Sequence, residues 1–270
     1  APGFVDTHRH MWQGILRNVL PDGSLDDYIA TVQKIFGAKY VPDDVYAGDY
    51  FSALGAIDSG VTCILDWSHI HNTPEHTDAA VKALSDSGVR AVFAYGNAQT
   101  ADGRWWEAKG SKYPGDIARL RKQYFSSDDQ LVTLYLAAPS LKKYLGPERA
   151  SQITPVKTYL EQGFLVVGGT DSPVVPVNPF WQFYHFLTRD TISDGVYGEN
   201  ERVTSRVDLL RMITINYAKL TGEADIKGSI EPGKLADFVV LSDDILSVAE
   251  RTIPNMRALA TYVGGKEVYR

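Results

Sequence analysis

The sequence is poor in several features that would each point to a particular class of protein. It holds one cysteine, Cys63, which excludes an intramolecular disulfide framework and a zinc site built from several cysteines. It has no apolar run long enough for a membrane-spanning helix, for which about 18 residues are needed. The 27 basic residues do not outnumber the 33 acids, and the net charge of -6 argues against a nucleic-acid-binding protein.

The composition is that of a globular chain with a substantial core, because 44% of the residues are hydrophobic and 22% are charged. A length of 270 residues suits one large domain or two modest ones. We expect a cytoplasmic protein. The chain begins at Ala1, without an initiator methionine and inside a strand-like run, as in a processed or trimmed chain, so its N-terminus carries no information on targeting.

A unit of one helix followed by one apolar strand recurs along most of the chain. The helices are expected to begin near prolines, and Gly60, Gly88 and Gly163 are expected to end three of them. Strands of this kind, apolar on both faces and separated by helices, indicate parallel βαβ units. The expected strands are 4–7, 61–67, 89–95, 131–137 and 164–169. The class is α/β, either an open doubly wound sheet or a (β/α)₈ barrel. No Gly-x-Gly-x-x-Gly follows any of these strands, which disfavours a dinucleotide-binding protein.

The last stretch changes character. We expect a helix over 207–220, a strand over 236–241, and a hairpin over 261–269 that turns at Gly264 and Gly265. These strands predict a small β module after the α/β part. Residues 97–115 are expected to form a long loop.

Two histidines, His8 and His10, directly follow the first expected strand. Residues i and i+2 of an extended chain point to the same side, so both imidazoles can converge on one metal ion. The carboxyl end of a parallel strand is also where α/β enzymes place their sites. The alternative is a pair of surface histidines at the start of a loop.

Asp171 follows the last expected apolar strand, after the paired glycines Gly168 and Gly169. A carboxylate at that edge of the sheet can bind a cation and accept a proton from water. The alternative is an aspartate that caps the turn before Pro173.

Three motifs, in this order, resemble the amidohydrolase superfamily of metal-dependent hydrolases. Pro2 to His10 (PGFVDTHRH) resembles its first-strand motif, and Gly169 to Pro173 (GTDSP) resembles its eighth-strand aspartate motif. Gly228 to Phe238 (GSIEPGKLADF) resembles the start of its C-terminal β-sandwich strands. Residues 1–96 look most like the branch of cytosine and guanine deaminases and chlorohydrolases, whereas 144–200 are more similar to amidohydrolases that act on amide-type bonds.

The resemblance implies a (β/α)₈ TIM-type barrel over 1–222 and a β-sandwich part over 223–270. It implies one divalent metal ion, zinc in the first place and Fe²⁺ as the alternative, held by His8, His10 and Asp171. Asp171 would also be the catalytic general base. The implied reaction is hydrolysis of a non-peptide carbon–nitrogen bond by metal-activated water, either deamination of a small heterocycle or cleavage of an amide.

The sequence also departs from the superfamily pattern. The superfamily uses further histidines from the fifth and sixth strands, but no histidine lies between His76 and Asp171. Five strands are found where a barrel needs eight, so we expect two or three βα units to be missing near 139–145, together with an N-terminal sandwich half. If the chain is complete, we expect little or no hydrolase activity. The competing function is therefore a non-catalytic, amidohydrolase-like protein that retains metal binding or an interaction role.

Further residues are candidates for the wall of the site. Trp12 and Gln13 resemble positions that contact a planar substrate in the deaminase branch, and His69 and His71 follow the second strand, where substrate contact, metal ligation or a polar loop all remain open. His76 is expected in solvent, Cys63 as an inert buried thiol, and Asp66 beside the site or in a turn. The aromatic cluster around His185 suits a core, a substrate wall or a homodimer contact. The expected partner is a small-molecule substrate, with no nucleic acid and no membrane.

Overall fold

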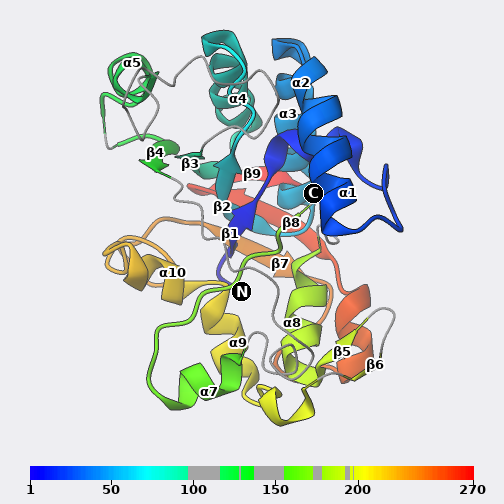
Figure 1. Ribbon diagram of the computed structural model, residues 1–270. Coiled ribbons are helices and arrows are strands. Elements are labelled where there is room, and N and C mark those ends of the chain that lie inside the picture. The colour runs from blue at the N-terminus through cyan, green and yellow to red at the C-terminus, as the bar shows by residue number, and fades with distance from the viewer. Residues whose placement is uncertain (97–115, 128, 137–154, 173–177, 192–194, 197) are drawn as a thin grey trace.

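The centre of the molecule is a parallel four-stranded sheet in the order β1-β2-β3-β4 (Figure 1). The computed structural model describes residues 1–96, 116–127, 129–136, 155–172, 178–191, 195–196 and 198–270. The strands are β1 (Phe4–Arg9), β2 (Val61–Ser68), β3 (Arg90–Tyr95) and β4 (Val132–Leu136). Four of the five expected strands are thus confirmed, and the protein has an α/β fold with a parallel sheet.

The helices between these strands follow the expected signals. Pro42 and Pro74 lie in the first turns of α3 (Pro42–Asp58) and α4 (Pro74–Ser87). Gly60 and Gly88, which follow these helices, have φ angles of 83° and 76°, a left-handed conformation that glycine adopts without steric cost. In Figure 1, α3 and α4 lie in the upper part of the molecule.

The other elements are mostly short. Before α3 come η1 (Met11–Leu16), α1 (Leu25–Tyr28), the π-helical η2 (Ile29–Phe36) and α2 (Gly37–Lys39). After β3 come α5 (Asp116–Gln123), α7 (Val156–Glu161), α8 (Pro179–Thr188), β5 (Asp190–Thr191), β6 (Gly195–Val196), η3 (Glu199–Glu201), α9 (Arg206–Met212), α10 (Ile215–Leu220) and η4 (Glu250–Asn255).

The strand expected over 164–169 is not formed, although its end does lie beside β1. Thr7 N–H donates to the Gly168 carbonyl (3.2 Å), Asp171 N–H donates to the His8 carbonyl (2.7 Å), and Arg9 and Ser172 form one parallel bridge. A regular ladder is interrupted because the Gly168 N–H bonds to the Met212 carbonyl instead. The prediction of a strand was wrong, but the predicted neighbourhood of Asp171 and β1 is present.

The single helix expected over 207–220 is divided into α9 and α10. Thr214, between them, has φ -138° and ψ -102°, far from helical values, so the intrahelical hydrogen bonds cannot continue through it. The apolar periodicity of the sequence runs through this break and gives no sign of it.

The C-terminal part forms a three-stranded antiparallel sheet of β7 (Phe238–Leu241), β8 (Ala258–Val263) and β9 (Lys266–Tyr269). The hairpin at Gly264 and Gly265 is as predicted. The first residues of the chain join this sheet, since the amino group of Ala1 donates to the Val239 carbonyl at 3.0 Å. The division into 1–222 and 223–270 stays a prediction.

The main core lies between the parallel sheet and the helices, with Phe4, Ile64 and Phe93 almost fully buried. Cys63 is buried as expected, and burial raises the pKa of its thiol to about 11. The loop expected over 97–115 and the segment near 139–145 lie outside the described residues. None of the described helices has the length and apolar character required to cross a membrane.

Candidate metal centre

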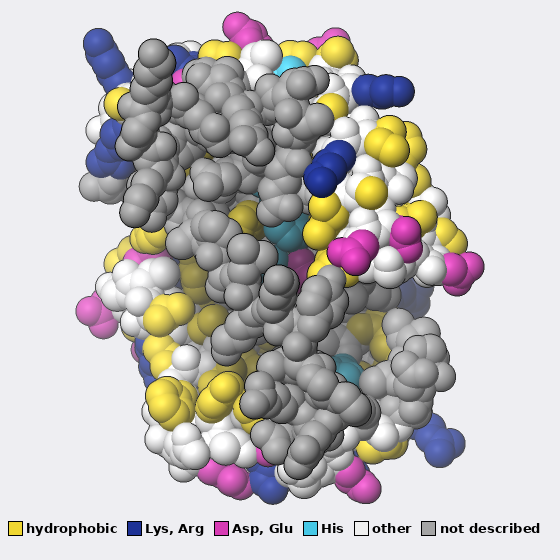
Figure 2. Space-filling model, viewed as in Figure 1, with side chains coloured by type: hydrophobic (Ala, Val, Ile, Leu, Met, Phe, Trp, Pro, Cys, Tyr) yellow, Lys and Arg dark blue, Asp and Glu magenta, His cyan; other side chains and the backbone are white. Residues whose placement is uncertain are grey.

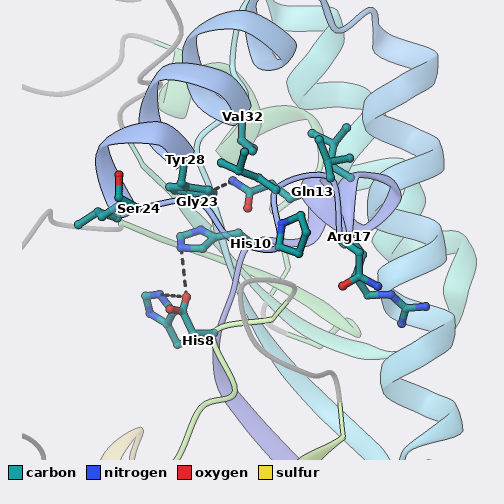
Figure 3. A pocket seen from close by; sticks show the side chains of 15 residues that line it. His8, His10, Gln13, Arg17, Gly23, Ser24, Tyr28 and Val32 are labelled. Carbon is teal, nitrogen blue, oxygen red and sulfur yellow. Dashed lines mark hydrogen bonds and ion pairs between the residues drawn. The ribbon is translucent and has the colours of Figure 1, made fainter. Parts of the chain in front are cut away.

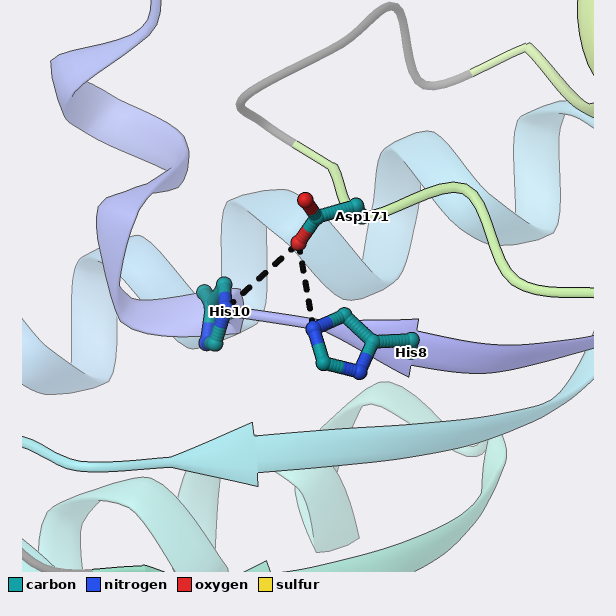
Figure 4. A group of neighbouring side chains, drawn as sticks. All are labelled: His8, His10 and Asp171. Atoms are coloured by element: carbon teal, nitrogen blue, oxygen red, sulfur yellow. Dashed lines mark ion pairs between the residues drawn. The ribbon is translucent and has the colours of Figure 1, made fainter. Parts of the chain in front are cut away.

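His8, His10 and Asp171 meet at the carboxyl end of β1 (Figure 4). Oδ1 of Asp171 lies 3.1 Å from Nε2 of His8 and 3.5 Å from Nε2 of His10. The three donor atoms lie within 4.8 Å of one another, and within the described part of the chain no other group of three such residues could hold a metal ion. The structure therefore brings together the three residues that the sequence singled out.

The donor atoms have the chemistry that a metal ion requires. Oδ1 of Asp171 is shielded from solvent and has no hydrogen-bond partner among the described residues, although the side chain as a whole is 48% exposed. Nδ1 of His10 lies 2.9 Å from the Trp67 carbonyl, which can only accept, so Nδ1 carries the proton and Nε2 presents its lone pair to the site. Burial lowers the pKa of His10, which favours the neutral imidazole that binds metals.

Gly169 allows the segment that carries Asp171 to come this close to β1. A Cβ atom at Gly169 would lie 2.5 Å from the backbone nitrogen of His8 and 2.8 Å from its Cβ. No side chain larger than hydrogen fits there unless the segment moves away from the strand. The glycine pair seen in the sequence therefore serves close backbone approach, as expected.

His8, His10 and Asp171, the three candidate ligands, lie on the wall of a cavity of about 790 Å³ (Figure 3). Near the middle of the face drawn in Figure 2, histidine and acidic side chains are visible side by side. The rest of the wall comes from η1, from the segment after it, and from the helical turns α1 and η2: Gln13, Leu16, Arg17, Asn18, Val19, Leu20, Pro21, Gly23, Ser24, Leu25, Tyr28 and Val32. A cavity of this size can hold a small organic molecule against the ligand group.

Gln13 and Tyr28 form one polar part of this wall. Nε2 of Gln13 donates to the Tyr28 hydroxyl at 2.6 Å, and burial raises the pKa of Tyr28. Gln13 lines the cavity, and its contact with substrate stays a prediction. Sequence reasoning missed Tyr28, because only the path of the chain after η1 brings it to the site.

Trp12 and His69 lie behind His10. Nε1 of Trp12 donates to Nδ1 of His69 at 2.8 Å, and the His69 ring stacks on the His10 ring with centroids 4.4 Å apart. Burial, together with the neighbouring histidines, lowers the pKa of His69 well below its ordinary value. Neither residue is among those that line the cavity, and their predicted contact with substrate remains untested. The structure shows Trp12 bonded to His69, and His69 stacked on His10.

His71 lies away from the ligand group. It is fully buried, stacks on Tyr95 at 3.8 Å and lies 3.0 Å from the Ser68 carbonyl through Nε2. Burial lowers the pKa of His71 to about 3. It is not one of the described cavity-lining residues, and its role in binding substrate also stays a prediction.

The expectation that His76 is solvated was wrong. His76 is 6% exposed, with Nε2 2.7 Å from the Tyr40 carbonyl and Nδ1 2.8 Å from the Thr73 hydroxyl. The first turn of α4 packs beneath the chain that leads into α3, and this contact covers the imidazole. His185 is half-buried in α8, with Nδ1 3.1 Å from the Asp190 carbonyl.

Two buried carboxyl groups lie beneath the site. Asp66, at the end of β2, accepts a hydrogen bond from the Met11 N–H at 3.1 Å, and Asp49 of α3 is fully buried. Burial raises the pKa of both groups, and their mutual repulsion raises that of Asp49 further. No pattern in the sequence pointed to Asp49, which occurs in a helix with several other acids.

Parts of this chain are similar in sequence to known enzymes. The N-substituted formamide deformylase of Arthrobacter pascens is 32% identical over 114 residues, which make up 42% of this chain and 21% of that protein. The 5-methylthioadenosine/S-adenosylhomocysteine deaminase of Thermococcus kodakarensis is 32% identical over 102 residues, 38% of this chain and 23% of that protein. The chain thus spans less than a quarter of the length of either relative.

Among solved structures, the zinc complex of the atrazine chlorohydrolase TrzN from Arthrobacter aurescens has a TM-score of 0.73. It is 16% identical, and the match covers 98% of this chain and 82% of that one, which shows a shared fold. A family model described as the amidohydrolase family matches residues 18–269, nearly the whole chain. This chain belongs to the amidohydrolase family.

Proposed function

We propose that this chain is a metal-dependent hydrolase that cleaves a non-peptide carbon–nitrogen bond of a small molecule. The observation that carries the proposal is the solvent-shielded Oδ1 of Asp171, which lies 3.1 Å and 3.5 Å from the Nε2 atoms of His8 and His10 on the wall of the cavity. Two imidazoles and one carboxylate with an open position suit zinc, and Fe²⁺ is the alternative for the same donors. TrzN, which shares the fold, is a zinc protein.

The residues of the chain divide the chemistry between them. A bound divalent ion would supply Lewis acidity, which lowers the pKa of water at the site towards neutrality. Asp171 is placed to take a proton from the attacking water and to donate it to the departing nitrogen. Gln13 and Tyr28 offer polar groups to orient the substrate. Deamination and amide cleavage both fit this scheme, and the relatives named above include a deaminase and a deformylase.

We further propose that the parallel sheet is part of a TIM-type barrel and that β7–β9 belong to a β-sandwich. The order of β1 to β4 is consecutive, as in a barrel. Residues 168–172 lie along the other side of β1, which is where the eighth strand of a barrel meets the first. This placement, together with the fold shared with TrzN, supports the barrel.

A non-catalytic protein that binds metal is the second candidate. It is favoured by one observation, that no histidine lies between His76 and Asp171, so the fifth- and sixth-strand histidines of the superfamily have no counterpart there. Both candidates predict metal binding, and only the first predicts turnover.

The test measures metal content and turnover on the same protein. The purified chain is loaded with zinc, its metal content is measured by inductively coupled plasma mass spectrometry, and release of ammonia or amine is followed with aminated heterocycles and N-substituted formamides. We expect His10→Asn and Asp171→Asn to lose both metal and turnover, whereas His185→Asn, in α8, keeps both. Metal binding without turnover would favour the non-catalytic protein, and a wild-type chain that binds no metal would overturn both candidates.

A further inference from the structure

Thr170 holds the turn on which Asp171 lies. Its side chain is buried, and its hydroxyl donates to Oδ2 of Asp6 at 2.5 Å and accepts from the Ser172 N–H at 3.2 Å. The Thr170 N–H also donates to Oδ1 of Asp6, at 2.8 Å. One hydroxyl therefore bonds to β1 on one side and to the residue after Asp171 on the other.

Asp6, the anchor of this turn, is itself held from several directions. It is 1% exposed, and besides Thr170 it accepts from the Arg9 guanidinium and from the His8 N–H, the latter at 3.3 Å. Arg9 is also buried, and its Nη1 donates to the Ser52 carbonyl at 3.3 Å. A buried carboxylate with this many donors is a fixed point, because moving it would leave charged groups unpaired.

Asp171 needs such a support because its backbone is in an unfavourable conformation. Its φ is 55°, in the left-handed region, where a residue with a Cβ atom is strained. Two backbone hydrogen bonds connect this turn to β1 and the residue after it. The Asp171 N–H donates to the His8 carbonyl (2.7 Å), and the His10 N–H donates to the Ser172 carbonyl (2.9 Å). The Thr170 hydroxyl closes the turn between these two bonds.

We propose that Thr170, anchored on Asp6, is a positioning residue for the metal centre. Its hydroxyl keeps Asp171 in the left-handed conformation that directs Oδ1 between the two imidazoles. Without this hydroxyl the turn relaxes towards ordinary φ values, and Oδ1 leaves the position it shares with His8 and His10. This inference rests on the proposed metal site.

The test compares Thr170→Val, which keeps the shape and loses the hydroxyl, with Thr170→Ser, which keeps the hydroxyl. Zinc affinity of the full chain is measured by competition with a chelator. We expect about 10- to 100-fold weaker binding for the valine variant, as is typical when support of a ligand is lost, and near wild-type binding for the serine variant. Equal affinity of the valine variant and wild type, or equal loss in both variants, would overturn the inference.

A spectroscopic measurement separates positioning from a general loss of stability. Each protein is saturated with Co²⁺, and the visible absorption bands, which report ligand geometry, are recorded at a temperature where circular dichroism shows folded protein. We expect altered band positions or intensity for Thr170→Val and a wild-type spectrum for Thr170→Ser. Identical spectra in all three proteins would overturn the inference, and a wild-type chain that binds neither ion would instead overturn the proposed function.

Discussion

The state of each histidine in the site is set by its hydrogen-bond partners. Indole can only donate, so Nδ1 of His69 accepts from Trp12, and Nε2 of the neutral ring must carry the proton. Nε2 of His69 lies 3.1 Å from the side-chain amide of Gln33. It donates a hydrogen bond to this amide when the amide is turned so that its oxygen faces the ring. His69 is therefore a neutral ring beneath His10, and it adds no positive charge next to this candidate metal ligand.

The buried carboxyl of Asp66 makes stability depend on pH. Burial raises the pKa of Asp66 from 3.8 to about 7, so the folded chain binds a proton that the unfolded chain releases. The free energy of unfolding therefore falls as the pH rises through this window. We expect Asp66→Asn, which has no charge to bury, to gain stability relative to wild type between pH 4.5 and pH 8, by on the order of 1–3 kcal/mol.

Urea unfolding of both proteins at several pH values measures this difference. The buried histidines His69 and His71 act in the opposite direction, because their pKa values are lowered, so the comparison with wild type is needed to isolate Asp66. Asp43→Asn, an exposed change in α3, is the control and should follow the wild-type pH dependence. A constant difference between Asp66→Asn and wild type at all pH values would contradict the prediction.

At the scale of helices and strands, the sequence predicted the helix ends and buried strands that local sequence signals determine. Proline and glycine mark the ends of α3 and α4, and the apolar runs between them are the buried strands. The segment 164–169 has the same apolar character, but its hydrogen bonds go to Met212 and to β1 rather than into a ladder. At the break next to Thr214, the Met212 and Ile213 carbonyls likewise accept hydrogen bonds from the distant residues Gly168 and Val5, which no local pattern shows.

The same distinction applies to the site. His8, His10 and Asp171 were found because their motifs are short and follow strands. Tyr28 and the bond from Thr170 to Asp6 were missed, because they join residues that are far apart in the sequence. The family resemblance pointed to the candidate ligands, while the residues that support them became visible only in three dimensions.

The contact between η1 and α3 depends on Gly48. A Cβ atom there would lie 2.2 Å from the Trp12 carbonyl oxygen, and η1 also carries Gln13 to the cavity. Alanine is the better helix former by about 1 kcal/mol, so propensity alone predicts that Gly48→Ala stabilises α3. We expect the opposite sign, a loss of about 1–3 kcal/mol, because the carbonyl can move only together with η1.

Chemical denaturation of Gly48→Ala measures this loss. Ala47→Gly, at the exposed neighbouring position of the same helix, is the control. It measures the free-energy difference between alanine and glycine in this helix where no Cβ atom collides with η1. Stabilisation of α3 by Gly48→Ala would show that η1 moves away at little cost, and the contact would then not fix the position of Gln13.

Considered as a whole, the molecule brings distant parts of the chain together at two places. Ala1 pairs with Val239 in the C-terminal sheet, and Asp171 bonds to His8 and lies beside His10 at the carboxyl end of β1. The candidate metal centre thus joins the first strand to a segment that follows β4 in the sequence. These contacts exist only in the folded chain, since the unfolded chain keeps the ligands far apart.

Metal binding should therefore stabilise the entire fold. A ligand that binds only the folded state adds about 2.7 kcal/mol at 100 times its Kd, which raises the melting temperature by several degrees in a chain of this length. We expect zinc to raise the melting temperature of the wild type in scanning calorimetry, to leave Asp171→Asn unchanged, and to raise that of His185→Asn as in wild type. An equal rise in Asp171→Asn would place the bound zinc elsewhere. Bound zinc with no rise in the wild type would mean that the unfolded chain binds it as tightly. We do not expect this, because Asp171 is more than 160 residues away from His8 and His10 in the sequence.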